Sequence, residues 1–151
     1  MVNVPRYLEY EDIIDNVCII KINKTYKQGM SEFELYEATR GTWKRKIESV
    51  SRASYCLSVA NGIVVEVYEI EQWYPAGTVP MQTRIVDLEK RIEFVGHPAM
   101  EKVRNRYIGK SVSHLFKRGE ASPIKVILSQ NASAIIPPNK QHITAIFVIF
   151  I

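Results

Sequence analysis

Residues Tyr55–Trp73, YCLSVANGIVVEVYEIEQW, contain the clearest structural signal in this sequence. Two segments rich in β-branched and aromatic residues flank the dipeptide Asn61-Gly62, which supplies both positive-φ positions of a type I′ turn. We therefore predict an antiparallel hairpin with strands over Tyr55–Ala60 and Ile63–Trp73. The second strand does not keep a strict alternation of polar and apolar residues, which predicts an irregularity within it.

Further strands and helices are predicted on both sides of this hairpin. Ser31 and Glu34 have the spacing of a capping box, so a helix should begin there and end near Gly41. A proline in the first turn indicates a second helix over Pro98–Tyr107, and a short third one is predicted over Val112–Phe116. The additional predicted strands are Val17–Ile22, Arg84–Leu88, Arg91–Val95 and Pro123–Leu128.

This order of elements predicts an α+β fold, with a mixed, curled or barrel-like sheet of five to six strands and two main helices. At 151 residues, the chain is long enough for one domain with its own core. We expect a single globular domain over residues 1–130. Residues 131–151 contain Pro137-Pro138 and an apolar end, which predicts a stiff linker followed by a strand.

Composition narrows the function classes. The net charge is +4 and the pI is about 9.1, which permits a polyanionic partner without requiring one. The two cysteines lie in apolar runs and are expected to be buried thiols, and the histidines lack metal-ligand spacing. We expect no cofactor and no metal. Without a signal-peptide pattern or a long apolar run, we also expect a cytoplasmic protein with no membrane partner.

Basic residues are concentrated in two stretches of the sequence. Residues 40–52 contain five cations and one acid, and residues 102–118 contain six cations and no acid. Two tryptophans and a tyrosine lie beside polar or turn residues. Because phosphates attract cations and exposed bases stack on aromatic rings, this combination predicts a nucleic-acid-binding site without catalysis. The candidate residues are Arg40, Trp43, Lys44, Arg45, Lys46, Tyr74, Arg104, Lys110 and Ser111.

In this hypothesis the basic candidates hold phosphates, and Trp43 or Tyr74 stacks on a base, which can be a modified or extruded one. The sequence leaves open whether Trp43 and Trp73 lie in the core or face a ligand. A nucleic acid is therefore the expected partner. RNA and DNA are not distinguished.

Two alternative functions remain open at this point. The first is a small metal-dependent nuclease or phosphodiesterase that uses Tyr107, Lys110, His114 and Glu120. Tyr107-Ile108-Gly109 resembles half of the GIY-YIG signature, but the spacing to the other half does not fit. The second alternative is a protein-interaction subunit or homodimer, in which the apolar C-terminal strand adds to a partner's sheet.

Four segments carry a resemblance to a known family: residues 22–44, INKTYKQGMSEFELYEATRGTWK; 53–77, ASYCLSVANGIVVEVYEIEQWYPAG; 91–99, RIEFVGHPA; and 107–126, YIGKSVSHLFKRGEASPIKV. They resemble a family of small uncharacterised bacterial proteins, whose segments also occur behind GIY-YIG-type nuclease domains. The resemblance implies an accessory reader or targeting module. In element order, the chain also resembles PUA-like domains of the ASCH and EVE type, which implies a curled sheet that binds RNA or a modified base.

Overall fold

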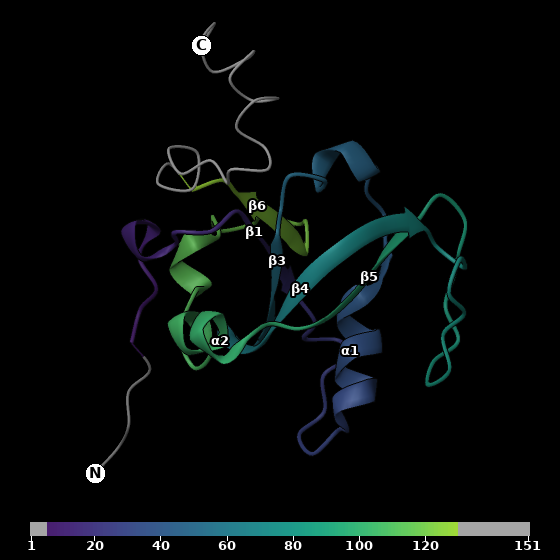
Figure 1. Ribbon diagram of the computed structural model, residues 1–151, viewed down its shortest axis with the longest axis horizontal. Helices are drawn as coiled ribbons and strands as arrows, with labels where there is room; N and C mark the ends of the chain where they lie inside the picture. The colour runs from purple at the N-terminus through teal and green to yellow at the C-terminus, as the bar shows by residue number, and fades with distance from the viewer. Residues whose placement is uncertain (1–5, 130–151) are drawn as a thin grey trace, which may run out of the picture.

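The computed structural model describes residues 6–129, and Figure 1 shows a curled sheet with one helix near each end. The six strands form one mixed sheet in the order β2-β5-β4-β3-β1-β6. The predicted α+β fold with a curled, mixed sheet is confirmed. The elements are β1 (Val17–Lys21), α1 (Glu32–Arg40), β2 (Gly41–Trp43), β3 (Tyr55–Ala60), β4 (Ile63–Pro75), β5 (Ile92–Pro98), α2 (Glu101–Tyr107) and β6 (Ile124–Ile127).

The predicted hairpin forms the centre of the sheet. β3 and β4 pair antiparallel, and the turn between them has positive φ at both Asn61 (52°) and Gly62 (80°), as a type I′ turn requires. The predicted irregularity is present: the register between β4 and β5 shifts between Ile70 and Gln72. This bulge increases the local twist, which helps the sheet to curl.

β1 and β3 pair in parallel, so the chain between them crosses over and carries α1 and β2 to the far edge of the sheet. β2 pairs with β5, and β6 pairs with β1, both antiparallel. The two edge strands are therefore β2 and β6. Gly41, which joins α1 to β2, lies so close to Glu93 that a Cβ atom there would be 2.7 Å from the Glu93 Cβ.

The two faces of the sheet carry separate apolar clusters, because alternate residues of a strand point to opposite sides. In β1, Val17 and Ile19 belong to the cluster that includes Val103 of α2. Cys18 belongs to the other cluster, which includes Phe94 and is packed against Tyr36 of α1. The two helices thus cover opposite faces.

Both cysteines are buried and free, as expected. Cys18 and Cys56 are neighbours across the parallel pair, and burial, with a hydrogen bond that the Cys56 thiol donates to Cys18, raises the pKa of the Cys56 thiol. Trp73 is also buried and contacts Phe94 edge to face at 5.2 Å between ring centroids. These groups belong to the core rather than to an exposed site.

The local predictions succeed where capping and turn residues are strong. The Ser31–Glu34 capping box is present in both directions, with distances of 3.0 and 3.1 Å. The strand predicted over Arg84–Leu88 is wrong, because this segment is part of the loop that joins β4 to β5. Residues 112–116 contain only a 3₁₀ turn at Ser113–Leu115. The predicted linker and strand over residues 131–151 lie outside the described residues.

Candidate nucleic-acid interface

A cavity of about 680 Å³ lies where the two edges of the curled sheet approach each other. The edges are joined by Arg45, which follows β2 and donates from Nη1 to the carbonyl oxygen of Ile124 in β6 at 3.0 Å. The loop after β1 and the loop before β5 supply the other walls. Its volume is within the range of about 300–1,000 Å³ that is usual for small-ligand pockets.

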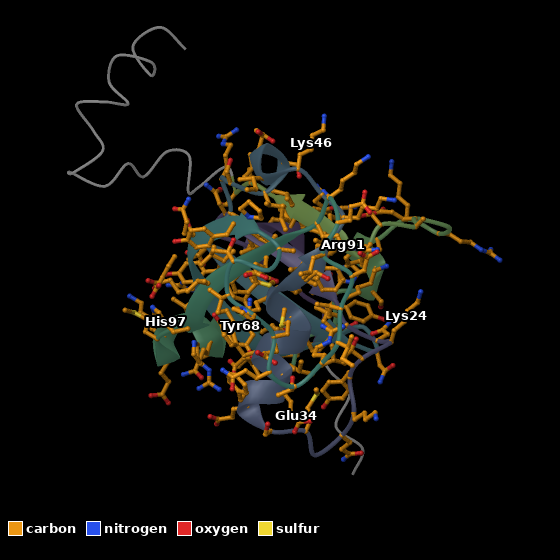
Figure 2. All side chains as sticks on the ribbon, turned by 90° about the vertical axis from the view of Figure 1, so that its right-hand side faces the viewer. Lys24, Glu34, Lys46, Tyr68, Arg91 and His97 are labelled. Carbon is orange, nitrogen blue, oxygen red and sulfur yellow. The ribbon has the colours of Figure 1, made fainter. Side chains whose placement is uncertain are left out.

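The lining of this cavity is strongly basic. It contains one carboxylate, Asp87, and six basic side chains: Lys21, Lys24, Lys44, Arg45, Arg84 and Arg91. Within residues 6–129, Arg91 is the one member of this set that forms an ion pair, at 3.8 Å from Asp87. Figure 2 shows Arg91 between Lys46 and Lys24 on one side of the molecule, with His97 at the opposite side. Below, "basic cavity" denotes this set of side chains and the space between them.

Trp43 adds an aromatic wall to the basic cavity. Its ring is partly buried, packs against the core cluster of Phe94 and lines the cavity. The indole Nε1 donates to the carbonyl oxygen of Thr39 at 2.8 Å, which fixes the ring relative to the end of α1. Trp43 therefore packs against the core on one side and borders the cavity on the other.

Buried carboxylates hold the loop that carries Arg84 and Arg91. Glu37, in α1, accepts hydrogen bonds from the backbone N–H groups of Gln82 and Thr83 and from the Thr83 hydroxyl, at 2.7 to 3.0 Å. Burial alone would raise the pKa of the Glu37 carboxyl, but these hydrogen bonds and nearby Arg40 keep it below its ordinary value. Glu37 is therefore charged at neutral pH.

Arg40 lies between the two buried carboxylates that hold this loop, Glu37 and Glu93. Its side chain is 2% exposed and lies 3.6 Å from Glu37 and 3.4 Å from Glu93, which are 1% and 0% exposed. Glu93 in turn accepts from the backbone N–H groups of Gly77 and Val79 at 3.0 and 2.7 Å. The buried arginine offsets part of the cost of burying the two carboxylates, and the hydrogen bonds that both carboxylates accept offset more of it.

Two further hydrogen bonds fasten the loop directly to β2. Arg84 Nη1 donates to the carbonyl oxygen of Gly41 at 3.0 Å, and the Thr42 hydroxyl donates to the carbonyl oxygen of Asp87 at 3.1 Å. Burial lowers the pKa of Arg84, an effect that Glu37 partly offsets. The stretch Arg84–Asp87 is thus held at both ends against β2, beside Trp43.

The sequence-predicted residues divide into two groups. Trp43, Lys44 and Arg45 line the basic cavity, and Lys46 is exposed at the neighbouring edge in Figure 2. Arg40 is buried in its ion pairs, so a phosphate does not reach it in this conformation. The partly buried Tyr74 lies in β4 and is not part of the cavity lining.

The remaining predicted residues lie near α2, at the opposite side of Figure 1 from the loop between β4 and β5. Arg104 donates to both carboxylate oxygens of Glu66, at 2.8 and 3.2 Å. Ser111 is buried where its backbone bridges to Tyr7 and Ile63. Lys110 is partly buried in the same segment. The two basic stretches of the sequence therefore do not form one patch through these residues.

Three of the four residues of the nuclease alternative, Tyr107, His114 and Glu120, contact other groups of the protein. The Tyr107 hydroxyl donates to Asp15 at 2.6 Å, and burial, with this hydrogen bond, raises the pKa of the phenol. Glu120 accepts from the backbone N–H of Lys117, and the His114 ring stacks on Tyr7. Within residues 6–129, no three His, Cys, Asp or Glu side chains are grouped as metal ligands.

Sequence reasoning missed four of the cavity residues as candidates: Lys21, Lys24, Arg84 and Arg91. Lys21 lies near the end of a predicted strand and Lys24 just beyond it, where loops often carry binding residues. That position was a usable signal. Arg84 and Arg91 were placed in strands, and nothing in their immediate sequence indicates the contact with α1 that brings them to β2.

Comparison with protein-family models, with curated proteins and with solved structures finds no match to this chain. None of the helices in the described part of the chain has the length and apolar character that crossing a bilayer requires.

Proposed function

We propose that this protein binds nucleic acid through the basic cavity and has no catalytic role there. The observation that supports the proposal is the excess of six basic side chains over one carboxylate in a concave site with an aromatic wall. Cations around a concave surface raise the local concentration of a polyanion. Here most of them also lack a carboxylate partner among the described residues, so their charge is available to phosphates.

In the proposed complex, Lys24, Lys44 and Arg45 contact the phosphates, and Trp43 stacks on a base that has turned out of the strand into the cavity. The cavity volume accommodates a small ligand rather than a duplex. A single-stranded or locally unpaired RNA or DNA is therefore the form that fits. The PUA-like resemblance noted in the sequence, in which a curled sheet holds a base, agrees with this proposal.

The proposal is tested by the salt dependence of binding. We expect the full-length protein to bind a labelled single-stranded RNA or DNA oligonucleotide, measured by fluorescence anisotropy at several salt concentrations. The double variant Lys24→Ala/Lys44→Ala should bind more weakly. Its slope of log K against log salt should fall in magnitude by about 1.4, because each lost phosphate contact of a single strand contributes about 0.7.

The matched control is Lys102→Ala/Lys110→Ala, which removes the same charge beside α2. Neither of these lysines forms an ion pair within residues 6–129 or lines the cavity, so the control should keep the wild-type slope. Absence of binding to either nucleic acid, or an equal loss in both double variants, would refute the basic cavity as the binding site.

A further inference from the structure

Arg91, which lines the basic cavity, carries an unsatisfied hydrogen-bond donor. Its Nε atom is shielded from solvent and has no hydrogen-bond partner among residues 6–129. The Asp87 oxygen is 3.8 Å away, which is too far for a hydrogen bond. A buried donor without an acceptor is costly and calls for an explanation. Arg40 Nη1 and Trp73 Nε1 also lack a hydrogen-bond partner in this part of the chain but lie in the core, whereas Arg91 lines the cavity, where a partner that is not protein can bind. The Arg91 side chain as a whole lines the cavity and is 31% exposed, so a ligand in the cavity can bind its guanidinium, and a small shift of the side chain then gives Nε its acceptor.

A second guanidinium is held beside the same space. Arg84 also lines the cavity, and its Nη1 bond to the carbonyl oxygen of Gly41 fixes the planar group before any ligand arrives. The Thr42–Asp87 hydrogen bond restrains the loop between the two arginines. The parallel N–H donors of an arginine guanidinium match the spacing of phosphate oxygens. A guanidinium that is already held in place loses less entropy on binding than a free one.

The charge of the cavity distinguishes between two kinds of phosphate. A phosphodiester inside a strand carries one negative charge, whereas a phosphate monoester carries about −1.5 to −2 at pH 7 and offers three acceptor oxygens. Six cations around one carboxylate, with a buried donor still unsatisfied, exceed what one diester would need. The cavity is also of a size for one small ligand rather than for a continuous strand.

We infer that the basic cavity holds a nucleotide by its phosphate monoester, with the monoester oxygens on Arg91 and Arg84 and the base against Trp43. This inference rests on the proposed function and specifies its ligand as a phosphorylated end. The same chemistry occurs at the phosphorylated terminus of a strand and in a free nucleoside monophosphate. These are two sources of one ligand group.

The test compares oligonucleotides that differ by one phosphate. Single strands of about eight nucleotides, labelled at one end, carry either a phosphate or a hydroxyl at the other end, with both polarities tried. The full-length protein should prefer one phosphorylated strand by about tenfold or more, as expected for charge-assisted hydrogen bonds to the additional oxygens. Competition with free nucleoside monophosphate then identifies the source: displacement at similar concentrations indicates the free nucleotide, and weak displacement indicates the strand end.

Two variants assign the preference to Arg91. In Arg91→Gln, the ratio of the affinities for the phosphorylated and the hydroxyl-ended strand should fall to about one. Arg91→Lys should lose most of the preference because lysine lacks the forked donors of a guanidinium. Lys102→Gln, which removes one charge beside α2, should keep it. Melting temperatures of all three variants show whether each remains folded at the assay temperature.

Equal affinity of wild type for phosphate and hydroxyl ends, or a full preference in Arg91→Lys, overturns this inference while the proposed function stands. Absence of binding to every strand overturns both.

Discussion

The basic cavity, with six cations, and the basic surface beside α2, with four, differ in what surrounds these cations. We use "α2 surface" for Lys102, Arg104, Arg106 and Lys110. Both arginines of the α2 surface are paired, Arg104 with Glu66 at 2.8 Å and Arg106 with Asp15 at 3.0 Å. In the cavity, the closest ion pair is the 3.8 Å contact of Arg91 with Asp87. The cavity cations also face one concave space, whereas the others lie around a helix.

This difference shows that the density of charge along a sequence does not measure the charge available to a ligand. Residues 102–118 contain no acid, yet Glu66 and Asp15 reach them from other parts of the chain. Conversely, the basic cavity draws its cations from three separate segments, so no single stretch of sequence contains it. The fold decides both the pairing and the grouping of charges.

The largest expected effect concerns Arg40, which belongs to the first basic stretch in sequence but not to the cavity. Arg40→Met should lower the free energy of unfolding by about 3–5 kcal/mol, because Glu37 and Glu93 would remain buried without their cation. Urea denaturation measures this change. At the same fraction of folded protein, the slope of nucleic-acid affinity against salt should match that of wild type.

Arg52→Met is the control, since Arg52 is an exposed arginine of the same stretch and no ion pair holds it within the described residues. Its unfolding free energy should change by no more than about 0.5 kcal/mol. A stable Arg40→Met protein with a reduced salt slope would show that Arg40 contacts phosphate and that the structural assignment is wrong.

The next effect concerns the aromatic wall that the α2 surface lacks. Trp43→Leu should weaken binding by about 1–3 kcal/mol through the loss of base stacking. Trp43→Phe also loses the bond from Nε1 to Thr39 but keeps a ring, so it should retain most of the affinity. Anisotropy titrations give both affinities, and denaturation curves correct for any loss of folded protein.

A fluorescence measurement on Trp73→Phe, in which Trp43 is the remaining tryptophan, gives an independent readout. Stacking of a base on the indole should quench this emission as oligonucleotide is added. Equal affinity of the Leu and Phe variants, together with unquenched emission, would remove Trp43 from the site.

The sequence predicted the parts of this fold that local chemistry determines. The Asn61-Gly62 turn and the Ser31–Glu34 capping box specify their elements by residues only a few positions apart. The loop before β5 has no such local signal. Ile85 and Val86 resemble a strand, but their neighbours Gln82 and Thr83 give their N–H groups to Glu37, about 45 residues earlier. Glu37 and Arg40 at helical spacing were a readable sign of an ion pair, and that sign argued against a free Arg40.

The smallest expected effect tests whether ion pairing is what keeps the α2 surface from binding nucleic acid. Glu66→Gln removes the carboxylate that holds Arg104, while the amide oxygen can still accept from the backbone N–H of Val67. If only the pairing keeps Arg104 from phosphates, the salt slope should steepen by up to about 0.7, the value for one additional contact with a single strand. If enclosure in the cavity is what matters, the slope should stay at the wild-type value. We expect the second result, because an isolated exposed arginine on a helix lacks the aromatic wall and the neighbouring cations that concentrate a strand. A steeper slope in Glu66→Gln that disappears in Glu66→Gln/Arg104→Gln would contradict this expectation and extend the binding surface to α2.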